Sequence, residues 1–159
     1  MSPEERLGKL LRAKGLTIAV AESCTGGLIS SRITDVAGSS DYFQAGLVTY
    51  SNGAKEVLLQ VPGELIAAKG AVSREVAEKM AEGVRTAMGV DLGLSVTGIA
   101  GPGGATAEKA VGTVYIGLAA KDGAFVRRHM FGGDRLSIKR QSADGALALA
   151  LDYLEGRGP

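Results

Sequence analysis

The sequence is poor in the side chains that most often bind metals or cross-link a chain. Its 159 residues include one cysteine, Cys24, and one histidine, His129. A single cysteine excludes an internal disulfide, which fits a reducing, cytoplasmic setting. With one histidine, one cysteine and no close cluster of carboxylates, we expect neither a metal site nor a metal cofactor.

The sequence also lacks an excess of one charge and a long apolar run. Its 18 basic and 17 acidic residues give a formal net charge of +1, so no strong positive field attracts nucleic acid. The apolar stretch 146–151 is followed closely by Asp152 and is far shorter than the ~20 residues that span a bilayer. The first twenty residues lack the layout of a signal peptide. We therefore expect no nucleic-acid partner, no membrane insertion and a cytoplasmic location.

Strand and helix patterns alternate along the chain, which is typical of an α/β fold. The predicted strands are residues 17–21, 43–50, 92–97, 112–120 and 124–131, the last two joined at an Asp-Gly pair that favours an antiparallel hairpin. The predicted helices are residues 3–14, 28–36 and 52–59, one that Pro62 opens, one that Ser73 caps, and one from Asp134 to Leu154. Together they predict a single three-layer α/β/α domain, residues 1–159, with a mixed central sheet.

Two glycine-rich loops, residues 22–27 and 97–104, directly follow predicted strands. In open α/β sheets the ligand site lies beyond the carboxyl ends of the strands, so both loops are expected to face one cleft. Ser23 sits between a strand and a helix, where a hydroxyl can act as a nucleophile, and Thr25, Gly26 and Gly27 offer backbone N–H groups to an oxyanion. The same residues also suit an ordinary helix cap.

A serine nucleophile needs a base, and the sequence offers few. His129 lies in a predicted strand beside arginines, which favours a structural role. A lysine can accept the proton if burial lowers its pKa, and Lys55 follows the second strand, with Tyr50 placed to relay or orient the proton. Lys55 also fits a solvated helix lysine. Cys24 is a rival nucleophile, although a lone cysteine after an apolar strand is more often buried packing.

The second glycine-rich loop does not carry a nucleotide triphosphate motif. It lacks the Gly-Lys-Ser/Thr ending of a Walker loop and does not open a helix as a dinucleotide fingerprint does. Its backbone N–H groups suit a single phosphate, and a plain connection between strands remains an alternative. Arg135, Lys139 and Arg140 provide either a phosphate contact or a solvated helix face.

Five segments in one order resemble the CinA C-terminal domain family. They are residues 21–27 (Ala-Glu-Ser-Cys-Thr-Gly-Gly), 48–52 with Lys55, 70–73, 95–102 and 111–114, and the match covers nearly the whole chain. The resemblance implies a stand-alone nicotinamide-nucleotide amidohydrolase, which converts nicotinamide mononucleotide and water into nicotinic acid mononucleotide and ammonia for pyridine-nucleotide recycling. It also implies a homodimer, no cofactor and a Ser/Lys mechanism.

The resemblance assigns roles position by position. The implied catalytic residues are Ser23, Lys55 and Tyr50. The implied substrate-binding residues are Thr25, Gly26, Gly27, Thr97, Gly98, Ala100 and Gly101. Two alternatives stay open, namely a non-catalytic nucleotide- or partner-binding relative linked to competence or DNA damage, and an amidase for another small carboxamide.

Overall fold

A mixed five-stranded sheet forms the centre of the molecule. The computed structural model describes residues 1–158, and its strands lie in the order β2-β1-β3-β4-β5. Their bounds are β1 Ile18–Glu22, β2 Phe43–Val48, β3 Leu92–Gly98, β4 Thr113–Ala120 and β5 Gly123–Met130. β1 is parallel to both β2 and β3, while β4 is antiparallel to β3 and to β5. The predicted mixed sheet is confirmed.

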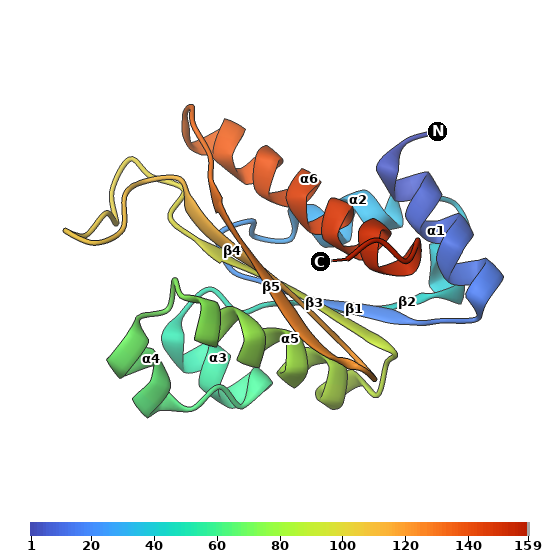
Figure 1. Ribbon diagram of the computed structural model, residues 1–159, viewed down its shortest axis with the longest axis horizontal. Coiled ribbons are helices and arrows are strands. Elements are labelled where there is room, and N and C mark those ends of the chain that lie inside the picture. The colour runs from blue at the N-terminus through green and yellow to red at the C-terminus, as the bar shows by residue number, and fades with distance from the viewer. Residues whose placement is uncertain (159) are drawn as a thin grey trace.

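Helices cover both faces of this sheet. Their bounds are α1 Pro3–Lys14, α2 Leu28–Thr34, α3 Asn52–Leu59, α4 Gly63–Lys69, α5 Arg74–Met88 and α6 Arg135–Leu154, with a short 3-10 turn at Ser39–Asp41. α5 packs across the strands on one face, with α3 and α4 beside it, and α1, α2 and α6 form the opposite layer (Figure 1). The structure therefore confirms the three-layer α/β/α architecture.

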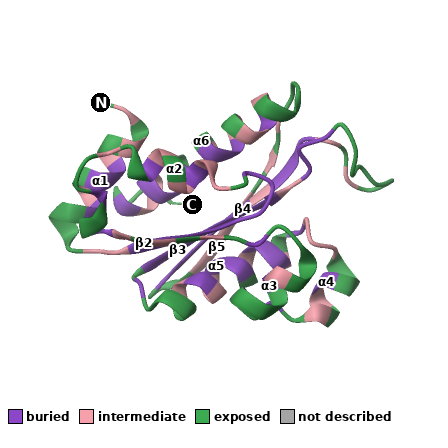
Figure 2. Cartoon of the chain, turned by 180° about the vertical axis from the view of Figure 1, so that it is seen from behind, coloured by how far each residue is buried: buried purple, intermediate pink, exposed green. Residues whose placement is uncertain are grey.

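The burial of each strand follows its place in the sheet. All five positions of β1 are buried, as expected for a parallel strand covered on both faces, whereas the edge strand β2 is partly exposed throughout (Figure 2). Successive side chains of β1 point to opposite layers. Val20 belongs to the core beneath α6, and Ala19 and Ala21 belong to the core beneath α5. The sheet thus separates two hydrophobic cores.

Small differences from the predicted elements occur at their ends. Ala120 pairs with Gly123, so the hairpin turn is Lys121-Asp122, and Gly123, with φ 133°, already belongs to β5. The predicted Asp-Gly turn is therefore displaced by one residue. Pro62 is the N-cap of α4, one position before the first helical residue.

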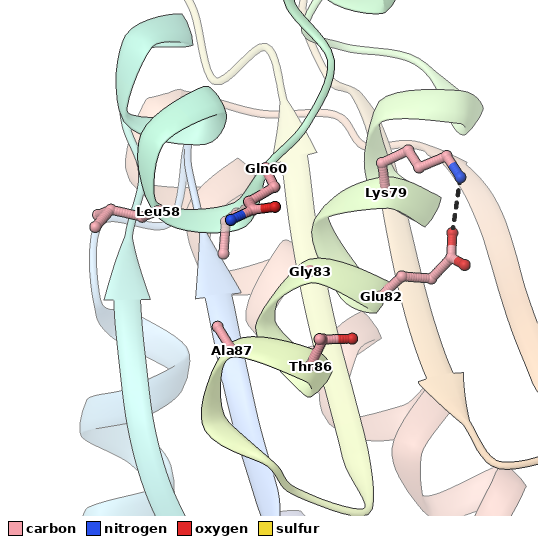
Figure 3. Close-up of a pocket in the computed structure, with 8 residues that line it drawn as sticks. Leu58, Gln60, Lys79, Glu82, Gly83, Thr86 and Ala87 are labelled. Carbon is pink, nitrogen blue, oxygen red and sulfur yellow. Dashed lines mark ion pairs between the residues drawn. The ribbon is translucent and has the colours of Figure 1, made fainter.

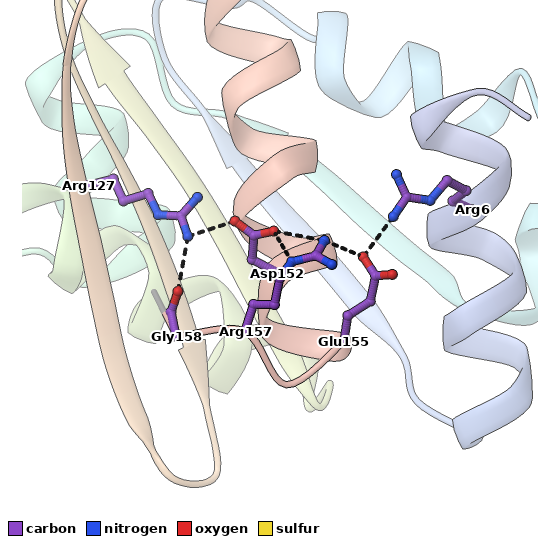
Figure 4. Close-up of polar contacts among 6 residues, drawn as sticks. All are labelled: Arg6, Arg127, Asp152, Glu155, Arg157 and Gly158. Carbon is purple, nitrogen blue, oxygen red and sulfur yellow. Dashed lines mark hydrogen bonds and ion pairs between the residues drawn. The ribbon is translucent and has the colours of Figure 1, made fainter.

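A network of ion pairs joins the end of α6 to α1 and β5 (Figure 4). Glu155 contacts Arg6 of α1 at 2.7 Å and Arg157 at 2.7 Å. Asp152 contacts Arg127 of β5 at 2.8 Å and Arg157 at 3.1 Å. The network holds the last residues of the chain against the first helix. Among residues 1–158, every helix is too short or too polar to cross a membrane.

Candidate functional site

The three parallel strands end side by side, and a cavity lies just beyond them. Glu22 of β1 pairs with Val48 of β2 and with Val96 of β3. The cavity encloses about 270 Å³, near the lower end of the range for small-molecule sites. Its lining includes Ser23, Lys55 and the loop after β3. The expectation that both glycine-rich loops reach one cleft is met.

Ser23 and Lys55 meet at the floor of this cavity. Lys55 Nζ lies 3.0 Å from Ser23 Oγ. Lys55 is only 1% exposed, because the N-cap Ser51, which accepts a hydrogen bond from Ala54 N–H, starts α3 so that this lysine faces inward. The burial is incompatible with a solvated helix lysine. Two residues 32 positions apart in sequence are therefore within hydrogen-bond distance.

The surroundings of Lys55 favour the neutral amine. Burial lowers the pKa of Lys55, opposed in part by the nearby Cys24. Within the described part of the chain, Lys55 forms no ion pair, and its other contacts are the carbonyl oxygens of Thr49 at 2.7 Å and Tyr50 at 3.3 Å. A neutral amine has two N–H groups and one lone pair. If the N–H groups donate to the two carbonyls, the lone pair faces the Ser23 hydroxyl and can accept its proton.

Ser23 is not a helix cap, because another side chain performs that task. The N-cap position of α2 is Gly27, and the Glu22 carboxylate accepts hydrogen bonds from the N–H groups of Gly27, Ile29 and Ser30. This leaves the Ser23 hydroxyl facing Lys55. The cap alternative for Ser23 is therefore excluded.

The backbone N–H groups that are unpaired near Ser23 differ from those expected. Gly26 N–H donates to the Ser23 carbonyl at 3.1 Å, and Gly27 N–H donates to Glu22, so neither is free for a ligand. Among residues 1–158, the N–H groups of Cys24 and Thr25 donate to no backbone carbonyl. Cys24 lines the cavity, whereas Thr25 is buried and, like Gly26 and Gly27, is not part of the lining.

Cys24 has the properties of a packing residue. Its side chain is 6% exposed, and burial raises the pKa of the Cys24 thiol to about 11. The thiol is therefore protonated near neutral pH, whereas the reactive form is the thiolate. This disfavours Cys24 as the nucleophile.

Tyr50 and Arg135 lie at the rim of the cavity. Tyr50 contacts Lys55 through its backbone carbonyl, while its phenol is exposed and its hydroxyl accepts a hydrogen bond from Arg135 at 3.1 Å. Arg135 also donates to the carbonyl of Gly101 at 2.6 Å. A proton relay through the Tyr50 hydroxyl is therefore not the arrangement observed. Lys139 lies one turn further along α6, beside Gly26.

The loop after β3 supplies the opposite wall. Thr97, Gly98, Ala100 and Gly101 line the cavity as expected. The segment before α5 completes this wall, since Thr97 Oγ1 donates to the carbonyl of Ala71 at 2.8 Å. Sequence reasoning gave that segment no role, although it falls within the matched residues 70–73.

Two other sequence candidates lie elsewhere. His129 stacks on Phe131 with ring centroids 4.8 Å apart, and burial lowers the pKa of His129, which agrees with a structural role. A second hollow between α3 and α5 carries Gln60, Thr86 and a Lys79–Glu82 ion pair of 3.5 Å (Figure 3), but no nucleophile paired with a base. Within residues 1–158, His, Cys, Asp and Glu do not gather in threes as metal ligands.

Comparison with known proteins finds relatives that match nearly the whole chain. Residues 1–154 match the CinA C-terminal domain. A putative competence-damage inducible protein of Moorella thermoacetica is 56% identical over 92% of the chain, and a CinA-like protein of Geobacter sulfurreducens is 56% identical over 95%. The chain spans about a third of the length of these relatives, 35% and 36%.

Solved structures share the whole fold. A CinA superfamily protein from Klebsiella pneumoniae has a TM-score of 0.93 at 30% identity, covering 98% of this chain and 99% of that one. The competence/damage inducible protein CihA of Agrobacterium tumefaciens has a TM-score of 0.89 at 38% identity, covering 98% and 97%. The chain therefore belongs to the CinA C-terminal domain family.

Proposed function

We propose that this chain hydrolyses the carboxamide of nicotinamide mononucleotide, giving nicotinic acid mononucleotide and ammonia, with Ser23 as nucleophile and Lys55 as base. The observation that carries the proposal is the 3.0 Å contact between Ser23 Oγ and a buried lysine whose pKa is lowered. A module that only binds a ligand does not need a hydroxyl paired with a desolvated amine.

The contacts support a two-step reaction. Lys55 takes the proton of Ser23 as Oγ attacks the carboxamide carbon, and the oxyanion accepts a hydrogen bond from the N–H group of Cys24, which lines the cavity. The Lys55 ammonium returns the proton to the leaving nitrogen, which departs as ammonia and leaves an acyl-Ser23 ester. Neutral Lys55 then accepts a proton from a water molecule, whose oxygen attacks the ester carbon. Lys55 passes this proton to Ser23 Oγ as the ester bond breaks, which restores the hydroxyl and releases the carboxylic acid.

The rim of the cavity suits the phosphate of the substrate. Arg135 and Lys139 lie one helical turn apart on α6 at the side of the nucleophile loop, and a guanidinium binds phosphate through paired N–H groups. Tyr50 and Gly101 hold the Arg135 guanidinium in place. We therefore assign the 5′-phosphate to this rim, with the loop 97–101 around the remainder of the nucleotide.

The test is ammonia release from nicotinamide mononucleotide by the wild type, Ser23→Ala and Lys55→Met, with a chelator present throughout. Each variant is expected to lower kcat at least about 1,000-fold while circular dichroism stays unchanged, because the two groups act as one unit. A fully active Ser23→Ala protein would refute the mechanism.

A comparison of substrates separates the alternatives. Arg135→Ala is expected to raise KM for the nucleotide roughly tenfold or more, since a hydrogen bond to a charged group contributes about 1.5–3 kcal/mol, and to leave KM for the riboside unchanged. Equal turnover of nucleotide and riboside by the wild type indicates an amidase for another carboxamide. No release from either indicates a binding role.

The homodimer stays a prediction that light scattering tests.

A further inference from the structure

Glu22 has an unusually complete set of hydrogen bonds for a side chain that contacts neither Lys55 nor the cavity. It is the last residue of β1 and is 0% exposed. Its Oε1 accepts from Thr25 Oγ1 at 2.7 Å, Gly27 N at 3.1 Å and Ile29 N at 3.0 Å. Its Oε2 accepts from Ser30 N at 2.9 Å and Ser30 Oγ at 2.6 Å. Five donors therefore converge on one carboxylate.

These donors belong to the loop that carries the nucleophile and to the first turn of α2. Three of them are backbone N–H groups, and those at the start of a helix have no partner within the helix. By accepting from them, Glu22 fixes the path of residues 23–27 at both ends. The backbone of the next residue, Ser23, therefore cannot shift without disturbing these bonds.

The backbone of Glu22 holds the other half of the pair. Its carbonyl oxygen accepts from Thr49 N at 2.7 Å, and the carbonyl of Thr49 in turn accepts from Lys55 Nζ at 2.7 Å. The Glu22 carboxylate holds the loop that contains Ser23, and the Glu22 carbonyl holds Thr49, whose own carbonyl contacts Lys55. Glu22 is thus the shared support of two groups that approach from distant parts of the sequence.

The two carboxylate oxygens of Glu22 accept from all five donors of this site. Each of its two oxygens accepts hydrogen bonds and donates none, whereas glutamine replaces one oxygen with an NH₂ donor. Placed at either position, that NH₂ faces at least one backbone N–H, which is then buried without an acceptor. The isosteric substitution Glu22→Gln therefore disturbs the loop without removing volume.

We propose that Glu22 is a positioning residue for the Ser23–Lys55 pair, acting through the nucleophile loop and never touching the substrate. The inference rests on the proposed function only in taking Ser23 as the nucleophile. It assigns the carboxylate a role distinct from acid or base catalysis. Loss of the carboxylate is expected to slow attack by Ser23 rather than to weaken substrate binding.

The experiment measures the rate at which a fluorophosphonate labels Ser23, followed by peptide mass spectrometry, together with kcat and KM for nicotinamide mononucleotide. Glu22→Gln is expected to lower both the labelling rate and kcat by about 10- to 100-fold, as small displacements of a reacting group do. KM is expected to change by less than about threefold. Glu64→Gln, at an exposed glutamate on α4, is the matched control and is expected to behave as wild type.

The outcomes separate this inference from the proposed function. A folded Glu22→Gln protein with wild-type labelling and kcat overturns the role of Glu22 alone, and so does a rise in KM with kcat unchanged. If the fluorophosphonate labels wild-type Ser23 but no ammonia is released, nicotinamide mononucleotide is refuted as the substrate. The labelling rates of wild type and Glu22→Gln then decide the role of Glu22. No labelling of the wild type refutes both. If Glu22→Gln does not fold, Thr25→Val is measured in its place, because it removes only one of the five donors to the Glu22 carboxylate. An intermediate loss of labelling rate and kcat supports the role of Glu22, and unchanged values overturn it.

Discussion

The burial of Lys55 disfavours its charged form, which lowers the pKa of the amine and reduces the stability of the native state when the amine is protonated. A lysine buried without a carboxylate must give up its charge or lose hydration, and burial lowers the pKa of Lys55. The fold retains this group because β1, β2 and the start of α3 converge on it. The same burial that lowers the pKa of Lys55 therefore makes the native state sensitive to protonation.

The consequence is a pH-dependent difference in stability between wild type and Lys55→Met. Below its lowered folded pKa, native Lys55 is protonated at a cost that the methionine variant does not bear. Between the folded value and the unfolded value of about 10.4, the unfolded chain binds one more proton than the native state, so wild-type stability rises with pH. We expect the Tm of wild type minus that of Lys55→Met to increase from pH 6 to pH 10. A difference that is constant with pH would show that Lys55 titrates normally.

At the scale of elements, the backbone of α5 packs directly against β3. Gly93 of β3 leaves room for the helix backbone, since a Cβ there would lie 2.2 Å from the Ala81 carbonyl oxygen and 2.8 Å from Arg85 Cβ. Gly117 of β4 has a similar role beneath Ala77. Because Gly93 and Gly117 lack a Cβ, α5 can lie close to β3 and β4. In this position the start of α5 lies near Ala71, which belongs to the cavity wall.

Gly93→Ala is expected to destabilise the protein by about 1–3 kcal/mol, because backbone on the facing helix must move. Urea denaturation monitored by circular dichroism measures the change. Gly132→Ala is the control, since no atom lies within 4 Å of the added Cβ, and its effect should stay within about 0.5 kcal/mol. Equal midpoints for the two variants would contradict the close approach.

The elements were easier to predict than the contacts of the site. Helix boundaries such as those of α1 and α3 follow from caps and apolar spacing, and the resemblance of the motifs pointed to Ser23 and Lys55, which lie 3.0 Å apart in the structure. The five hydrogen bonds to the Glu22 carboxylate were not predicted, because a glutamate that ends a buried strand has no local pattern indicating which donors surround it. The direction of the Tyr50 phenol depends on Arg135, 85 positions away, and no local periodicity encodes such a contact.

At the scale of the whole molecule, the ion pairs around Asp152 and Glu155 connect the C-terminal end of α6 to α1 and β5. Arg127 donates to Asp152, and this hydrogen bond is the main cause of its lowered pKa, with Arg157 adding to the effect. The pairs are partly exposed, so their contribution is limited to within about 1 kcal/mol.

Asp152→Asn is therefore expected to lower Tm modestly at neutral pH. A carboxylate with a lowered folded pKa contributes stability above its unfolded value of about 3.9, and this contribution disappears as pH falls through the folded value. The difference in Tm between wild type and variant should be constant from pH 5 to pH 8 and shrink below pH 4. Calorimetry across this range measures it, and a difference that persists in acid would point to packing instead of charge.

The course of α6 separates the cavity from both ends of the chain. Arg135, at the first turn, lies at the cavity, and the helix continues for 20 residues, which corresponds to roughly 30 Å. Its far end lies beside α1, where Pro3 and Arg157 line the same surface hollow (Figure 1). Pro3 and Arg157 thus lie at the corner remote from Ser23, so a polypeptide attached at this corner would leave the mouth of the cavity uncovered.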